Sequence, residues 1–177
     1  MPGEEPKGLV EVYTGNGKGK TSAAMGVALR AIGHGQRVHI VYFMKGSYPY
    51  GEQSAMSKLP NITFSRFGHQ SFVDPKNVTP GEKEEAQKAL LAAREAVLSG
   101  DYDLVILDEV NVAIAWKLLE LDDVVDLINK KPEKVELILT GRYADAKLVK
   151  LADLVTEMLD IKHPYDTGVA ARRGIDY

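Results

Sequence analysis

Short hydrophobic runs alternate with longer amphipathic segments along almost the whole chain. Most of the short runs are continuous in Val, Ile and Leu. Continuous runs of this kind are typical of strands that are covered on both faces of a parallel sheet. The pattern predicts strands at residues 9–13, 37–43, 62–67, 104–107, 135–139 and 154–158.

The segments between these runs have the spacing and the end signals of helices. The clearest helix begins at Thr79-Pro80-Gly81-Glu82, which supplies a capping threonine, a proline at the first helical position and a glutamate three residues after the cap. Gly100 ends the same helix. We expect the other helices at residues 21–32, 111–119, 122–129 and 145–152.

This alternation of strands and helices predicts an α/β fold with a mostly parallel, doubly wound sheet of about six strands. No repeat or linker divides the sequence. A chain of 177 residues, of which 45% are hydrophobic, suits one domain that spans residues 1–177. In such a sheet, ligands bind at the carboxyl ends of the strands. Four segments directly follow predicted strands and are therefore expected to line this edge, namely residues 14–21, 43–46, 108–109 and 140–142.

The most informative segment joins the first strand to the first helix. Glycine occupies every second position of this loop, and Gly-Lys-Thr closes it. In such a loop, backbone N–H groups point at a chain of phosphates and the helix N-terminus adds positive partial charge. Lys20 would neutralise the outer phosphates, and the Thr21 hydroxyl would bind Mg²⁺. The predicted nucleotide contacts here are Thr14, Gly15, Asn16, Gly17, Lys18, Gly19, Lys20, Thr21 and Ser22.

The loop departs from the generic motif, which has glycine where this chain has Thr14. The alternative interpretation is a glycine-rich turn that binds nothing. The strand before the loop, the helix after it and an acidic strand end farther along favour phosphate binding. Together these features indicate a RecA-like P-loop fold.

The acidic strand end is Asp108-Glu109, which follows the hydrophobic run at 104–107. Mg²⁺ prefers oxygen ligands and takes one or two carboxylates besides phosphate oxygens. Because the carboxyl ends of parallel strands meet at one sheet edge, these carboxylates and Thr21 are expected to form one metal site. By itself, the pattern is also consistent with a strand that simply runs into a polar loop.

Charge and composition narrow the class of partners. A formal net charge of −3 argues against nucleic acid held by bulk electrostatics, and the absence of cysteine excludes disulfides and thiolate chemistry. The N-terminus is polar, and no segment approaches the roughly 20 apolar residues that span a bilayer. We therefore expect a cytoplasmic protein that binds neither membrane nor nucleic acid.

With these residues in hand, the chain resembles the ATP:corrinoid adenosyltransferase family of cobalamin biosynthesis, from about Gly8 to Tyr177. The tail from Lys162 to Tyr177 is the most specific part, because generic P-loop ATPases have no such ending. The other resembling segments are the phosphate loop and residues 30–35, 43–46, 48–52, 107–109, 139–142 and 151–158.

The resemblance implies that a Co(I) corrinoid attacks C5′ of ATP and releases triphosphate, so that ATP and a corrinoid are substrates and Mg²⁺ assists. It implies Lys20, Asp108 and Glu109 as catalytic residues, with Glu109 the more important carboxylate. Thr21, Asp108 and Glu109 are implied metal ligands, and Arg30 is implied as a further nucleotide contact. A homodimer and a flavin-type reductase as partner are also implied.

The resemblance also implies a corrinoid contact. Family members often have a Gly-Phe-Thr-Trp-like stretch whose aromatic residues help to remove the lower axial ligand of cobalt. Phe72 stands at the position of that phenylalanine, whereas Asp74 occupies the place of the tryptophan.

Two other functions fit the phosphate loop. A RecA-like ATPase switch would hydrolyse ATP, and Arg142 lies on a loop suited to an arginine finger. A regulatory module would bind the nucleotide without chemistry. The products separate the three hypotheses, because adenosyl transfer releases triphosphate and hydrolysis releases ADP and phosphate.

Overall fold

The computed structural model describes residues 7–46 and 50–176. Helices and strands alternate along the chain as the hydrophobic pattern predicts. In chain order the elements are β1 (Val10–Thr14), α1 (Lys20–Gly33), β2 (Val38–Tyr42), α2 (Gly51–Met56), β3 (Ile62–Arg66), α3 (Pro80–Leu98), β4 (Leu104–Asp108), α4 (Val110–Ala115), α5 (Leu121–Lys130), β5 (Glu136–Thr140), α6 (Ala146–Leu151), β6 (Leu154–Glu157) and the 3₁₀ helix η1 (Pro164–Thr167).

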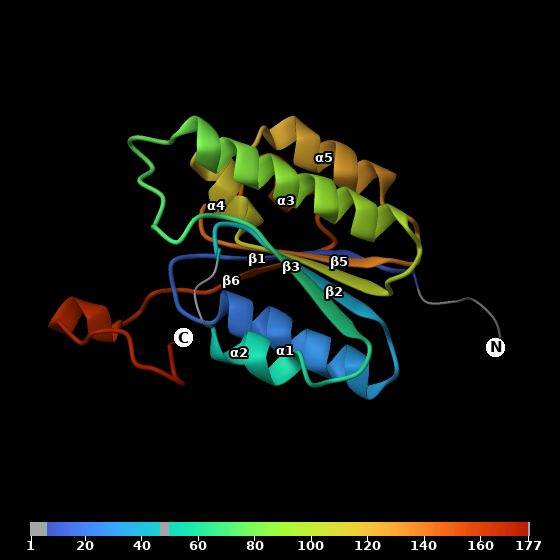
Figure 1. Cartoon of the computed structure of the whole chain (residues 1–177), viewed down its shortest axis with the longest axis horizontal. Coiled ribbons are helices and arrows are strands. Elements are labelled where there is room, and N and C mark those ends of the chain that lie inside the picture. The colour runs from blue at the N-terminus through green and yellow to red at the C-terminus, as the bar shows by residue number, and fades with distance from the viewer. Residues whose placement is uncertain (1–6, 47–49, 177) are drawn as a thin grey trace.

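The strands form one six-stranded sheet in the order β3-β2-β4-β5-β1-β6. Every neighbouring pair is parallel, so the expected mostly parallel sheet is entirely parallel over the described residues. Helices α1 and α2 cover one face, and α3, α4 and α5 cover the other (Figure 1). The α/β, doubly wound fold class is confirmed.

The buried strands explain why the hydrophobic runs are continuous. Along β4, for example, Val105 and Leu107 pack on the side of α3 and α5, whereas Leu104 and Ile106 pack on the side of α1. Both sets are buried because helices cover both faces of the sheet. Each central strand therefore contributes side chains to two hydrophobic cores.

The predicted start of α3 is confirmed in detail. The Thr79 hydroxyl accepts a hydrogen bond from the Glu82 N–H, and the Glu82 carboxylate accepts one from the Thr79 N–H. The two residues thus satisfy each other's exposed backbone donors.

Helix α4 is shorter than the predicted helix at 111–119. It ends at Ala115, because Lys117 adopts a left-handed backbone conformation with φ 58°. The next two residues, Leu118 and Leu119, are buried and extend the hydrophobic pattern without extending the helix. Helices α2 and η1 were not predicted, since they are too short to show a helical periodicity.

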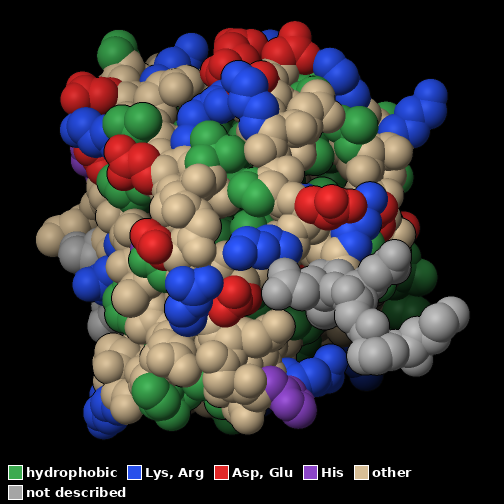
Figure 2. Space-filling view, turned by 90° about the vertical axis from the view of Figure 1, so that its right-hand side faces the viewer, with side chains coloured by type: hydrophobic (Ala, Val, Ile, Leu, Met, Phe, Trp, Pro, Cys, Tyr) green, Lys and Arg blue, Asp and Glu red, His purple; other side chains and the backbone are tan. Residues whose placement is uncertain are grey.

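The end of the sheet at which the strands begin carries interspersed acidic and basic side chains, with hydrophobic side chains only in small patches between them (Figure 2). Within the described part of the chain, no helix is long and apolar enough to cross a membrane. The opposite end of the sheet, where the strands finish, holds the candidate site.

Candidate nucleotide site at the carboxyl edge of the sheet

A cavity of about 570 Å³ opens where the central strands end. The phosphate loop, residues 14–21, contributes one wall through residues 17–21, and the other walls come from segments that follow β2, β3, β4 and β5 and from the C-terminal tail. The sheet edge thus brings together segments that the sequence predicted to meet there. The lining residues are Gly17, Lys18, Gly19, Lys20, Thr21, Ser22, Phe43, Met44, Lys45, Tyr50, Phe72, Val73, Glu109, Val112, Trp116, Arg142, Tyr143, His163 and Asp176.

The phosphate loop is held against the segment that follows β6. The Gly17 N–H donates a hydrogen bond of 2.7 Å to the Met158 carbonyl oxygen. Gly15 has a φ of 94°, and a Cβ atom added there would lie 2.4 Å from the same oxygen. Position 15 therefore requires glycine for two reasons, its backbone conformation and its close approach to another backbone segment.

Thr14 explains the departure from the generic motif. It is the last residue of β1, paired with Glu157 of β6, and is therefore in extended backbone. Its hydroxyl accepts a hydrogen bond from the Ala144 N–H at 3.2 Å. A glycine at this position would lose that link between the loop and the segment after β5.

Lys20 points into the phosphate loop. Its ammonium donates hydrogen bonds to the carbonyl oxygens of Gly15, at 2.8 Å, and Gly17, at 2.7 Å. Burial, and then repulsion by Arg142, lower the pKa of Lys20, while Glu109 and Asp108 oppose the change. A phosphate in the loop would replace neutral carbonyl partners with charged ones, which make stronger hydrogen bonds to an ammonium.

Asp108 lies at the centre of the polar contacts beneath the cavity. Its Oδ1 accepts hydrogen bonds from the hydroxyls of Thr21, at 2.9 Å, and Thr140, at 2.7 Å. Its Oδ2 accepts one from the Lys45 ammonium. The side chain is fully buried, with an exposed fraction of 0%. Asp108 therefore connects the start of α1 to the ends of β2 and β5.

Lys45 is held on the opposite wall by charge and by aromatic faces. Its ammonium lies 4.8 Å from the ring centre of Tyr50 and 5.5 Å from that of Tyr42. Burial alone would lower the pKa of Lys45, but the charge of Asp108 and the hydrogen bond to it outweigh burial and raise it. Lys45 is therefore a fixed cation beside the cavity.

Glu109 presents the second carboxylate to the cavity. It has a left-handed backbone conformation with φ 67°, and its N–H donates a 3.0 Å hydrogen bond to the Thr140 hydroxyl. Burial, followed by the nearby charge of Asp108, raises the pKa of Glu109 against the influence of the surrounding cations. The sharp turn thus leaves Asp108 buried and turns Glu109 toward the open space.

These oxygen atoms fit a magnesium ion that also binds phosphate. Thr21 and Glu109 line the cavity, and the buried Asp108 carboxylate beneath it accepts a hydrogen bond from the Thr21 hydroxyl. Over residues 7–46 and 50–176, no group of three or more His, Cys, Asp or Glu side chains could hold a metal ion. The remaining ligands would have to be phosphate oxygens and water, as is usual for Mg²⁺.

The structure does not bring Arg30 into the cavity. Arg30 is in the last turn of α1, ten residues beyond Lys20 and about 15 Å along the helix axis. Its side chain is exposed at the end of α1 that faces away from the loop. This position does not support the direct nucleotide contact that the resemblance implied.

Phe72 lies at the rim of the cavity and is 91% exposed. An aromatic side chain this exposed packs against little of its own protein. The tryptophan expected by the resemblance is replaced by Asp74, which instead accepts a hydrogen bond from the Lys76 N–H. Tyr48, Pro49 and Tyr177, which carried part of the resemblance, lie outside the described residues.

The sequence pattern assigned no role in the site to several residues that line the cavity, namely Lys45, Tyr50, Trp116, Tyr143, His163 and Asp176. Lys45 could be placed at this sheet edge from the sequence, because residues 43–46 directly follow a predicted strand. Asp176 could not, since it reaches the site only when the tail folds back. Its carboxylate pairs with Lys18 and Arg172, and these contacts lower its pKa.

Comparison with known proteins adds an independent finding. The family described as ATP:corrinoid adenosyltransferase BtuR/CobO/CobP matches residues 6–177. The corrinoid adenosyltransferase of Escherichia coli K12 is 36% identical over 98% of this chain and 88% of its own length. The corrinoid adenosyltransferase CobA of Salmonella typhimurium is 35% identical with the same coverage, and that of Pseudomonas aeruginosa is 34% identical over 98% of this chain and 85% of its own length.

Proposed function

This chain belongs to the ATP:corrinoid adenosyltransferase family and is a corrinoid adenosyltransferase of cobalamin biosynthesis, and we propose that its site works as follows. The substrates are ATP and a corrinoid reduced to Co(I). The Co(I) electron pair attacks C5′ of ATP, and a cobalt–carbon bond forms. The bond between C5′ and the phosphate oxygen breaks, and the triphosphate leaves with that electron pair.

The observation that best supports this reaction is the combination of a phosphate loop with a large open cavity beside it. Co(I) is itself a strong nucleophile, so the protein needs no nucleophilic side chain, and the chain has no cysteine. The task of the protein is to align C5′ with cobalt and to stabilise the leaving triphosphate. Lys20 and the loop N–H groups are suited to the second task.

We assign residues 14–22 to the triphosphate, with Lys20 as the main cation. Thr21, Asp108 and Glu109 would hold Mg²⁺, which supplies positive charge to the triphosphate oxygens. Asp108 is buried and bonded to Thr21, so it orients the threonine hydroxyl. Glu109 faces the cavity and is the carboxylate more accessible to a hydrated ion.

Phe72 is our candidate for the corrin contact. Its ring is almost fully exposed at the rim of the cavity and free to cover an apolar macrocycle. We also propose that the protein is cytoplasmic, functions as one domain and as a homodimer, and receives its electron from a flavin-type reductase. These four points rest on the sequence and the family resemblance.

The test is to incubate the protein with Mg²⁺, ATP and chemically reduced cobalamin. We expect the absorption spectrum of adenosylcobalamin to develop and triphosphate to accumulate, with a Lys20→Ala variant as the inactive control. ADP and phosphate in place of triphosphate would identify the ATPase switch, which Arg142 makes chemically reasonable. Binding of ATP without either product would identify a regulatory module.

A further inference from the structure

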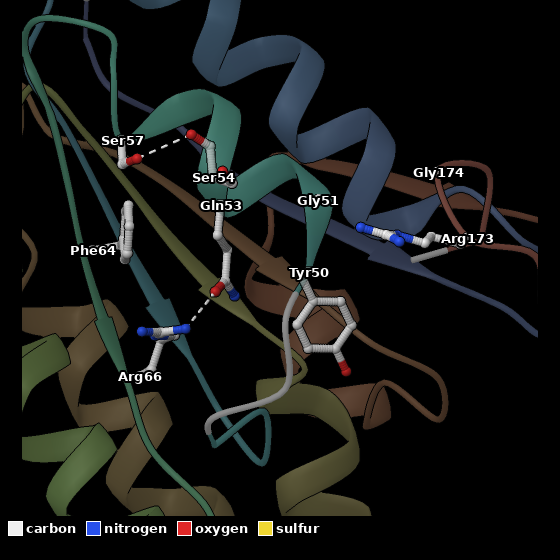
Figure 3. Close-up of a pocket in the computed structure, with 9 residues that line it drawn as sticks. All are labelled: Tyr50, Gly51, Gln53, Ser54, Ser57, Phe64, Arg66, Arg173 and Gly174. Atoms are coloured by element: carbon white, nitrogen blue, oxygen red, sulfur yellow. Dashed lines mark hydrogen bonds between the residues drawn. The ribbon is translucent and has the colours of Figure 1, made fainter.

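A second cavity, of about 580 Å³, lies between α2, the end of β3 and the C-terminal tail (Figure 3). It is separate from the phosphate loop, none of whose residues lines it. The lining residues are Tyr50, Gly51, Gln53, Ser54, Ser57, Phe64, Arg66, Arg173 and Gly174. The reaction proposed above uses none of these side chains.

The charge of this cavity is positive. Arg66 and Arg173 line it from opposite sides of Tyr50 in the view of Figure 3, and no acidic residue is among the lining residues. Within the described part of the chain, neither arginine forms an ion pair. Guanidinium groups bind carboxylates and phosphates through paired N–H donors, so the cavity is suited to anionic oxygen groups.

Gln53 provides a second and independent indication of a ligand. Its side-chain oxygen accepts a 2.9 Å hydrogen bond from Arg66 Nη1. Since a guanidinium can only donate, this contact identifies the other amide atom as nitrogen. That nitrogen is buried, the residue is 4% exposed, and Nε2 has no hydrogen-bond partner among the described residues. A buried donor without an acceptor is unfavourable, and a ligand oxygen would satisfy it.

The second cavity adjoins the nucleotide cavity. Tyr50 lines both, and the tail contributes Arg173 to one and Asp176 to the other. A ligand that is larger than either cavity could therefore occupy the first with its reactive centre and the second with its periphery. A corrinoid has this form, because acetate and propionate side chains surround its macrocycle as free acids or as amides.

Resting on the proposed function, we infer that the second cavity is a subsite for the peripheral carboxylates of the corrinoid acceptor. Arg66 and Arg173 would pair with free carboxylates, and the Gln53 amide would donate to one of their oxygens. An amidated side chain could still accept from Gln53 but would gain little from the two charges. The site therefore favours acceptors that keep free carboxylates over fully amidated ones.

The test compares two acceptors with chemically prepared Co(I). Cobyrinic acid has free peripheral carboxylates, whereas those of cobinamide are amides. Arg66→Gln and Arg173→Gln should each raise KM for cobyrinic acid about tenfold, with less than about a twofold change for cobinamide and for ATP. Both arginines are exposed, so these variants should fold. Lys58→Gln removes one exposed positive charge outside the cavity and should change neither KM.

Two further measurements, together with the outcome of the acceptor comparison, test this inference. Titration of oxidised cobyrinic acid, which needs no turnover, should show the same loss of affinity in the arginine variants. Equal effects on both acceptors, or none, would overturn the subsite while leaving the proposed function intact. Failure of the wild type to adenosylate either acceptor would overturn the function itself. If Arg66→Gln instead weakens binding of inorganic triphosphate, the cavity is a phosphate site and the inference is wrong.

Discussion

Replacing Lys45 with methionine tests the central feature of the site, the buried pair between Lys45 and Asp108. Methionine keeps most of the apolar length of the side chain and removes the charge. The exposed fractions of the two side chains are 10% and 0%, so the ion pair is largely shielded from water. The substitution would leave the Asp108 carboxylate buried without its cation.

The structure sets the expected magnitude. Removal of one partner from a buried ion pair costs about 3–5 kcal/mol. Asp108 keeps the hydroxyl donors of Thr21 and Thr140 on its other oxygen, so we expect the lower end of that range. Loss of the cation–π contact with Tyr50 adds about 0.5–1 kcal/mol. The predicted loss in the free energy of unfolding is therefore about 3–4 kcal/mol.

Urea unfolding at pH 7 measures this loss. With an m-value of about 2 kcal/mol/M, the midpoint should fall by about 1.5–2 M. Because the pKa of Lys45 is raised above its ordinary 10.5, its stabilising contribution is complete below pH 10.5 and is lost as the pH rises through the folded-state pKa. The difference between wild type and Lys45→Met should thus be constant from pH 6 to 9.

A double-mutant cycle with Asp108→Asn separates the interaction energy of the Lys45–Asp108 pair from unrelated destabilisation by the substitution. The double variant lacks the buried charge, so it should be more stable than the sum of the single losses predicts, by about 2 kcal/mol or more. Lys58→Met, an exposed lysine, is the control and should change stability by less than about 0.5 kcal/mol. Additive losses, or a loss below about 1 kcal/mol for Lys45→Met, would refute the reasoning.

Three further substitutions test other parts of the structure. Gly15→Ala places a Cβ atom 2.4 Å from a backbone oxygen, at a residue whose φ is positive. The melting temperature and the ATP affinity should therefore both fall. Gly33→Ala is the control: its Cβ would meet nothing within 4 Å, so it should lower neither. Burial, together with Glu11, raises the pKa of Glu136 from 4.5 to about 7. The folded state therefore binds this proton more tightly than the unfolded state, and the free energy of unfolding falls as the pH rises from 4.5 to about 7. Glu136→Gln should remove this dependence of stability on pH. After allowance for partial exposure of the side chain, it should be more stable than wild type at pH 8 by about 1–2 kcal/mol. Thermal unfolding measures this, and an unchanged pH dependence would contradict the prediction. Phe72→Ala should leave the melting temperature unchanged, because the ring is 91% exposed. It should slow adenosylation more when a biological reductant must generate Co(I) than when chemically prepared Co(I) is supplied. Equal losses in the two assays would exclude the corrin role.

Much of the fold could be predicted because each element carries its own local signal. The continuous run at 104–107 can be stabilised only where both faces are covered, and β4 is indeed buried on both sides. Elements without a local signal were missed or misjudged. Helix α2 has only six residues, and the pattern after Ala115 stays hydrophobic although the chain turns at Lys117.

Part of the candidate site could likewise be predicted from the sequence. Parallel strands end at one edge, so Lys20, Thr21, Asp108 and Glu109 could be placed together from their positions after strands or at the start of a helix. The sequence could not assign different environments to the two carboxylates. That difference comes from the left-handed turn at Glu109, which buries one side chain and directs the other to the cavity.

By itself, then, the sequence determined the layered fold, the phosphate loop and the acidic strand end, because these depend on periodicity and on short-range motifs. Only the tertiary structure decided which groups complete the site. Lys45 is paired with a carboxylate 63 positions away, and Asp176 with a lysine 158 positions away. The tertiary structure also places Arg30 away from the cavity. It brings Arg66 and Arg173 to the second cavity, which the Gln53 amide also lines. Charge pairing and burial depend on distances in space, and no local pattern in the chain encodes those distances.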